Sequence, residues 1–295
     1  MIGRITSSTL TQQTLRTLQA NLAERDRLQN QATSQRAFRS PSEDPAAAAT
    51  ALGLHGEQTR AAQYARNIGD GTAWATTVDT ALGASVDLLN RARDLTVQGA
   101  NSGALSATAR GSIAAELESI RDEMLAQANT TVLGRSVFAG TSDAGRAFDP
   151  GTFAFTGTGA DGVQRRISDD ETVRVDADGS QVFGQGKDSV FALLGDVAAE
   201  LRSGTEVGAR LGDIDARLSA MVAARGSIGA RQAQLERASS HNVAVSTDLE
   251  ARRAEVENVD SVEVLVRLQS AQLVYQSALQ VTAKSLQTNL LEFLR

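Results

Sequence analysis

Residues 35–46 read QRAFRSPSEDPA and hold two of the three prolines of the chain. Proline lacks a backbone N–H and clashes with the preceding helical turn, so this stretch interrupts any helix that enters it. Asp44 suits the N-cap position and Pro45 the first helical position. The stretch therefore separates two predicted helices, one over about residues 6–36 and the next over about residues 46–100.

The two ends of the chain carry apolar stripes of the same spacing. Apolar residues three and four positions apart fall on one face of an α-helix. Upstream of the break this face holds Leu15, Leu18, Leu22 and Leu28. After a capping pair, Asp260 and Glu263, the last helix carries Leu265, Leu268, Tyr275, Leu279, Leu286, Leu290 and Phe293. Because both helices span about 30–35 residues, or ~50 Å, we expect them to pair as an antiparallel coiled coil.

Helical spacing also occurs on both sides of the middle of the chain. Ser106 is a candidate N-cap for a third helix, and a fourth helix is expected from about Ser189. The clearest heptad follows, with Val207, Leu211, Ile214, Leu218, Met221, Ile228 and Leu235. Apolar stripes of this kind pack helices side by side in a bundle.

The segment between these helices has a different composition. Residues 143–195 hold nine of the 25 glycines and five of the eight phenylalanines. Residues 152–156, 163–167 and 172–175 alternate in the manner of short strands. Asp178-Gly179 is a common hairpin turn. We therefore expect a small β-rich insertion here.

Together these patterns predict a mainly α, elongated helical bundle with three parts. Residues 1–42 and 258–295 form terminal coiled-coil helices, and residues 43–142 and 196–257 form a helical rod bundle. Residues 143–195 form the β-rich insertion.

Charge and composition argue against several functional classes. The chain has 29 basic and 35 acidic residues, a net charge of −6, and it lacks the basic face of a nucleic-acid-binding protein. It has no cysteine, and its two histidines, His55 and His241, are far apart in sequence. We therefore expect no enzyme and no catalytic or metal site.

A glycine motif and the hydropathy pattern lead to two further expectations of absence. Residues 157–162 match G-x-G-x-x-G, but strand-like alternation follows where a dinucleotide-binding motif needs a helix, so we expect a loop and no cofactor. No run of 18 apolar residues is present, and residues 1–11 lack the apolar segment of a secretory signal peptide. We expect no membrane insertion.

The terminal helices have polar faces with few charges. From Gln269 to Gln287 the single charged residue is Lys284. Helix faces in water usually carry interspersed acidic and basic residues, so an uncharged face suits close contact with other subunits. The predicted assembly interface comprises the eleven stripe residues of the two terminal helices given above.

Several blocks resemble the bacterial flagellin family. Arg4-Ile5-Thr6 and QRAFRSPSEDPA resemble its N-terminal signature, in which a turn ending in Ser-x-x-Asp-Pro-Ala precedes a long helix. RNIGDG at residues 66–71 and LLNRARDLTVQ at 88–98 resemble its first rod helix, and residues 259–260 and 290–294 its final helix. The resemblance covers residues 1–142 and about 200–295.

Within that family, two blocks resemble members that lie at the junction between hook and filament. They are NTTVLGRSVFAG at residues 129–140 and LQSAQLVYQSAL at residues 268–279. The short insertion also suits a junction protein, and a filament flagellin is the alternative. A coiled-coil adaptor or signalling protein ranks lower, because the terminal helices lack charged flanking positions throughout.

The resemblance implies a non-enzymatic structural protein that self-assembles into a ring joining hook to filament. The terminal helices would line the inner tube, with the bundle outside them and the insertion outermost. The implied partners are copies of the chain, a hook-side junction protein, flagellin, and an export chaperone that binds the C-terminal helix. The chain would be secreted unfolded by the flagellar type III apparatus to an extracellular position at the junction.

Overall fold

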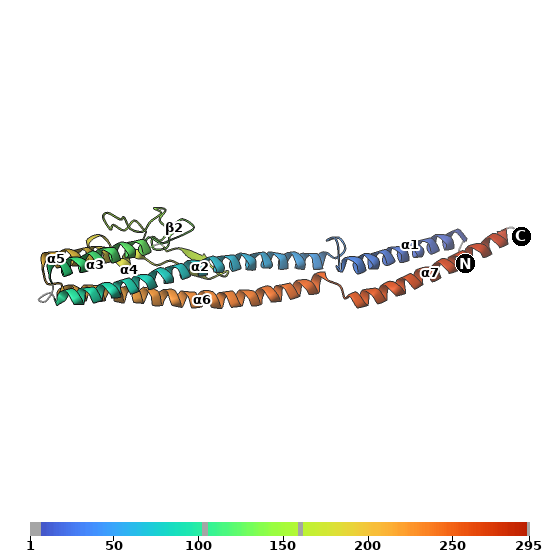
Figure 1. Ribbon diagram of the computed structural model, residues 1–295. Coiled ribbons are helices and arrows are strands. Elements are labelled where there is room, and N and C mark those ends of the chain that lie inside the picture. The colour runs from blue at the N-terminus through green and yellow to red at the C-terminus, as the bar shows by residue number, and fades with distance from the viewer. Residues whose placement is uncertain (1–6, 102–105, 159–161, 294–295) are drawn as a thin grey trace. The chain divides into compact units, whose positions relative to one another are not determined.

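The computed structural model describes residues 7–101, 106–158 and 162–293 and is mostly helical (Figure 1). Its longer helices are α1 Ser7–Ser34, α2 Pro45–Ala100, α3 Ala107–Ala128, α5 Val190–Ser203, α6 Leu211–Glu257 and α7 Ser261–Phe293. Shorter elements are β1 Thr131–Val132, β2 Arg135–Ser136, β3 Gln164–Arg166, β4 Thr172–Arg174, α4 Gly179–Phe183, η2 Gly186–Asp188 and η3 Gly208–Arg210. The chain divides into two compact units, residues 61–244 and residues 1–60 with 245–295.

In the unit of residues 61–244, α2 and α6 run side by side (Figure 1). The predicted heptad is confirmed, because Val207, Ile214, Met221, Ile228 and Leu235 are all buried. Arg225 occupies the heptad position between Met221 and Ile228, where a polar residue interrupts the apolar series. Its Nε donates to Asp79 Oδ1 at 2.8 Å, which ties α6 to α2.

α3 and α5 pack against each other in the same unit. The Ser106 hydroxyl accepts a hydrogen bond from Ala109 N, and the Ser189 hydroxyl accepts one from Ala192 N. Both expected N-caps are therefore present. Each satisfies a backbone N–H that the first helical turn leaves without a partner.

Five phenylalanines join residues 143–195 to the helical core. Phe148 is fully buried, with its ring centroid 5.2 Å from that of Phe191 and 5.8 Å from that of Phe183. The same buried cluster includes side chains of α2, α3 and α6. The segment thus shares one core with the bundle.

Regular strands in the described part of residues 143–195 are short. β3 and β4, with three residues each, pair antiparallel, and the β1–β2 hairpin lies before the segment. The strand expected at residues 152–156 is reduced to an isolated antiparallel bridge between Phe155 and Phe148, with a turn before it. Asp149 Oδ1 accepts hydrogen bonds from Gly151 N and Thr152 N, which turns the chain back. These bonds lower the pKa of Asp149, the Thr152 N–H having the largest effect.

The hairpin turn expected at Asp178-Gly179 is also wrong. Asp178 is the N-cap of α4, and its Oδ1 accepts a hydrogen bond from Ser180 N at 2.9 Å. Asp-Gly suits either a turn or a helix start, because the carboxylate can cap free N–H groups in both. Here the following residues, Val182 and Phe183, have a buried place against the core.

Because of a salt bridge between α3 and α5, we expect the stability of the fold to decrease at acidic pH. Arg202 Nη2 donates to Glu118 Oε2 at 2.7 Å, and this hydrogen bonding lowers the pKa of Glu118 below its ordinary value of 4.5. A carboxyl with a lowered pKa adds stability above its unfolded-state pKa and loses it as the pH falls through the folded-state pKa.

Glu118→Gln should therefore cost a little stability at neutral pH and flatten the decline of stability below pH 4.5. The effect is small because both side chains are partly exposed. Urea unfolding at a series of pH values measures it. Parallel pH profiles for the two proteins would contradict the assignment.

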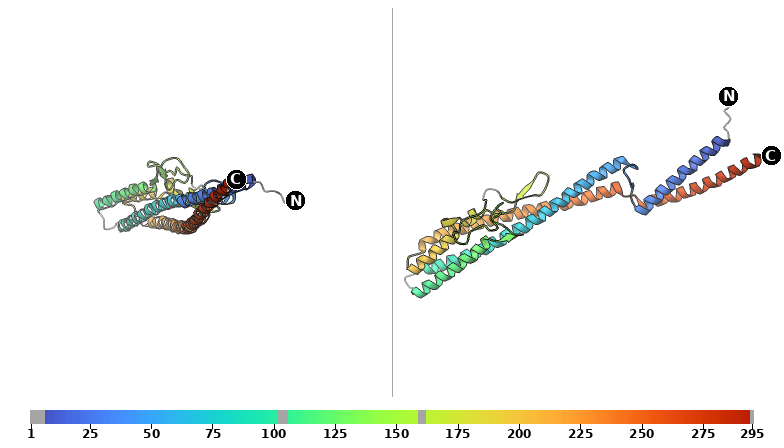
Figure 2. Two further views of the ribbon diagram at one scale, coloured as in Figure 1. Left: turned by 90° about the vertical axis from the view of Figure 1, so that its right-hand side faces the viewer. Right: turned by 90° about the horizontal axis from the view of Figure 1, so that it is seen from above.

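In the other unit, α1 and α7 lie side by side, as the two views of Figure 2 show. α1 ends at Ser34, two residues before the expected end, because Gln35 has a φ of 55° and turns the chain away. The break after α1 meets the break between α6 and α7. Ala37 N donates to Glu257 O at 2.7 Å and Val259 N donates to Gln35 O at 3.2 Å.

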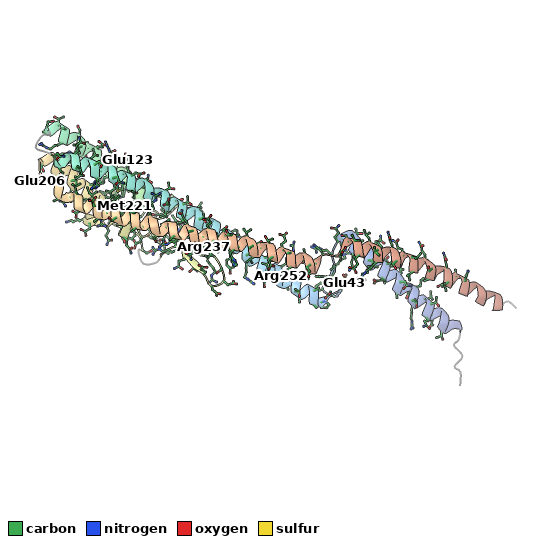
Figure 3. All side chains as sticks on the ribbon, turned by 90° about the horizontal axis from the view of Figure 1, so that it is seen from below. Glu43, Glu123, Glu206, Met221, Arg237 and Arg252 are labelled. Atoms are coloured by element: carbon green, nitrogen blue, oxygen red, sulfur yellow. The ribbon has the colours of Figure 1, made fainter. Side chains whose placement is uncertain are left out.

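Side-chain hydrogen bonds also form beside the break after α1 and the break between α6 and α7. His55 Nε2 lies 2.7 Å from Glu257 Oε1, which links α2 to the end of α6. Asp260 Oδ1 accepts hydrogen bonds from Val262 N and Glu263 N and so caps α7 as expected. Figure 3 labels Glu43 at the first break and Arg252 on the adjoining part of α6.

Candidate assembly surface

α1 and α7 meet along a seam with heptad spacing. On α7 the seam holds Val264, which is 6% exposed, and the half-buried Leu268, Ala271, Tyr275 and Ala278. On α1 it holds Leu28, which is 3% exposed, and the half-buried Leu18 and Leu22. Alternating steps of three and four residues keep one face of each helix turned to the other.

Polar groups add to the seam. The Arg25 guanidinium lies 5.1 Å from the centre of the Tyr275 ring, a cation–π contact between α1 and α7. Glu24 accepts hydrogen bonds from Arg27, which lower the pKa of Glu24, and the charge of Arg267 on α7 lowers it further. The charged groups beside the seam are thus complementary across the two helices.

The predicted interface residues fall into three groups. Leu18, Leu22, Leu28, Leu268 and Tyr275 lie in the seam within the chain. Leu15, Leu265 and Leu279 are 49%, 51% and 41% exposed, so they are available to another molecule. The side chains of Leu286, Leu290 and Phe293 lie outside the described part of the structure.

A second set of exposed apolar residues on α7 was missed by the sequence analysis. Val262, Val266 and Leu273 are 72%, 61% and 67% exposed, and Val274 and Val281 are 50% and 67% exposed. At 100° per residue, Val262, Val266 and Leu273 fall on the side of α7 opposite the seam. The predicted interface included only residues of a single apolar stripe. Plotting all apolar residues around the helix axis places these residues on its other side.

α7 is therefore apolar on its outer side as well as in its seam. An exposed helix with apolar residues on opposite sides needs partners on both to remove them from water. Glutamines at 269, 272, 276 and 280 lie among these residues and add uncharged hydrogen-bonding groups. The surface suits close packing against other helices.

Two further features were sought in the described ranges, a metal site and a membrane-spanning helix. Within them, no three histidine or acidic side chains are grouped so as to hold a metal ion. No helix in those ranges has the length and hydropathy needed to cross a membrane.

Comparisons with known proteins point to one family. The family described as "bacterial flagellin N-terminal helical region" matches residues 5–143. The family described as "bacterial flagellin C-terminal helical region" matches residues 211–294. These two ranges contain the seam and the outer side of α7.

Individual relatives carry a more specific name. "Flagellar hook-associated protein 3" of Salmonella typhimurium is 28% identical over 217 residues, covering 69% of this chain and 68% of the relative. The Escherichia coli protein of that name is 28% identical over 189 residues, covering 64% and 56%. The crystal structure of Bacillus cereus FlgL has a TM-score of 0.60 at 19% identity and covers 68% of this chain and 99% of that one.

Proposed function

Because the chain belongs to the bacterial flagellin family, we propose that it is the structural component that joins the flagellar hook to the filament. Two relatives named hook-associated protein 3 support this position over that of a filament flagellin. The observation that carries the mechanism is the outer side of α7, where the described residues of the chain leave large apolar side chains uncovered.

Self-assembly follows from that surface. The α1–α7 pair buries its seam but leaves Leu15, Leu265 and Leu279 between 41% and 51% exposed. Neighbouring copies would cover these residues and so place the terminal helices in the inner tube of a ring. The bundle and the residues of the predicted insertion would then surround the tube. This arrangement needs no catalytic group, and we propose no enzymatic activity.

The other partners follow from the same position. One edge of the ring would contact a hook-side junction protein, and the other would contact flagellin. Export through the flagellar type III apparatus requires an unfolded chain, and a chaperone that covers the apolar sides of α7 would keep the unassembled helix from aggregating. The proposed location is extracellular, at the hook–filament junction.

Deleting the gene in its native strain tests the joining role. We expect hooks without attached filaments and full-length flagellin in the medium, since flagellin would still be exported but could not attach. Deletion of a filament flagellin would instead leave the medium without that flagellin. Attached filaments of normal length in the deletion strain would overturn the proposal.

A further inference from the structure

An open groove runs between α1 and α7 on one flank of the pair. Its floor and walls include Leu28 of α1 and Ser270, Ala271 and Val274 of α7. Asn21 lines the α1 side. The two small side chains at 270 and 271 leave room for side chains that enter from outside.

The charges at this groove are already compensated. Glu24 and Arg267 stand on opposite helices at its rim, and Arg267 also donates to Glu263 one turn away. An occupant therefore needs no charge of its own. An apolar helix face with few charges is a suitable one.

The outer side of α7 is such a face. Val262, Val266 and Leu273 form a ridge, which we call the α7 ridge, and Figure 3 shows side chains projecting from both edges of this helix. Val266 and Leu273 are seven residues apart, or ~10 Å along the helix. The groove extends over residues 267–274 of α7, which is the same distance. The part of the ridge from Val266 to Leu273 thus has the length of the groove, and Val262 lies about one helical turn beyond it.

The ridge cannot enter the groove of its own chain. The groove residues of α7 lie on its flank, about a quarter turn from the ridge, and both belong to one rigid helix. We propose that the α7 ridge of one copy packs into the α1–α7 groove of the next copy. This inference rests on the proposed function, since it specifies the contact between copies in the ring.

Such a contact joins two different surfaces, so each copy can bind one neighbour on either side. Head-to-tail contacts form a closed ring when the rotation between copies closes, and an open helix otherwise. Packing a ridge into a groove also accounts for the small residues at 270 and 271, because helices approach closely where side chains are small.

Cysteine cross-linking tests the contact without background, because the chain has no cysteine. Two differently tagged full-length chains, Val266→Cys and Ser270→Cys, are co-expressed in a strain that lacks the native gene. Flagella are isolated and oxidised, and mixed dimers are detected by both tags. A disulfide requires Cβ atoms about 3.5–4.5 Å apart.

The matched control replaces Ser270→Cys with Gln272→Cys, an exposed residue on the opposite flank of the ridge. We expect at least tenfold more mixed dimer from the 266/270 pair than from the 266/272 pair. Equal yields, dimers formed only between two Val266→Cys chains, or cross-links only to another flagellar protein would overturn the inference.

The test also separates this inference from the proposed function. Flagella that contain the tagged chains but lack the cross-link overturn the ridge-and-groove contact alone. Absence of the wild-type chain from flagella overturns both.

Discussion

Replacing Phe148 with alanine is expected to lower the free energy of unfolding of the bundle by about 3–5 kcal/mol. Phe148 is fully buried, and its ring contacts those of Phe155, Phe183 and Phe191 at centroid distances of 5.2–5.8 Å. Its removal leaves a cavity where the helices and the loops of residues 143–195 share their core. Few other single changes to the bundle should cost as much.

Urea unfolding followed by tryptophan fluorescence measures this loss. Trp74 is the single tryptophan, is 2% exposed and lies in the same unit as Phe148. Phe148→Leu serves as the control, because it keeps most of the volume and should cost less than about half as much. A loss below ~1 kcal/mol for the alanine variant would contradict a shared core.

Replacing Leu279 with aspartate is expected to reduce incorporation into flagella at least tenfold and to abolish swimming. Leu279 is 41% exposed within one chain, and assembly would bury it against a neighbour. A carboxylate there would be buried without a partner, at a cost of several kcal/mol. Trp74 fluorescence should be unchanged, because the substitution lies in the other unit.

The same substitution at Leu133 is the matched control. Leu133 is 92% exposed at the tip of the β1–β2 hairpin and has a φ of 49°. Aspartate adopts such a conformation more readily than leucine, so Leu133→Asp should fold and incorporate normally. Immunoblots of isolated flagella compare the two. Normal incorporation of Leu279→Asp would contradict the interface assignment.

The helical parts of the fold could be predicted because their signals are local. The heptad from Val207 to Leu235 and the caps at Ser106 and Ser189 depend on residues within one or two turns. The structure and the comparisons confirm the flagellin-like helical fold. The loops around Asp149 and Asp178 could not be predicted in the same way. A short acidic side chain caps whichever N–H groups the tertiary fold leaves free.

The candidate interface shows a different limit. Sequence spacing located the stripe on α7 but could not tell which residues face α1 and which remain exposed. Leu268 lies in the seam, whereas Leu265, three residues earlier, is 51% exposed. Val264 in the seam and Val266 on the ridge were both missed. The sides of a helix can be assigned only when the position of its partner is known.

Antibody–gold labelling of intact flagella by electron microscopy shows whether this chain occupies the junction between hook and filament. We expect label confined to a short band where the hook meets the filament. Label along the whole filament would contradict that position and make the chain a filament flagellin. Flagella without label would contradict the proposed function altogether.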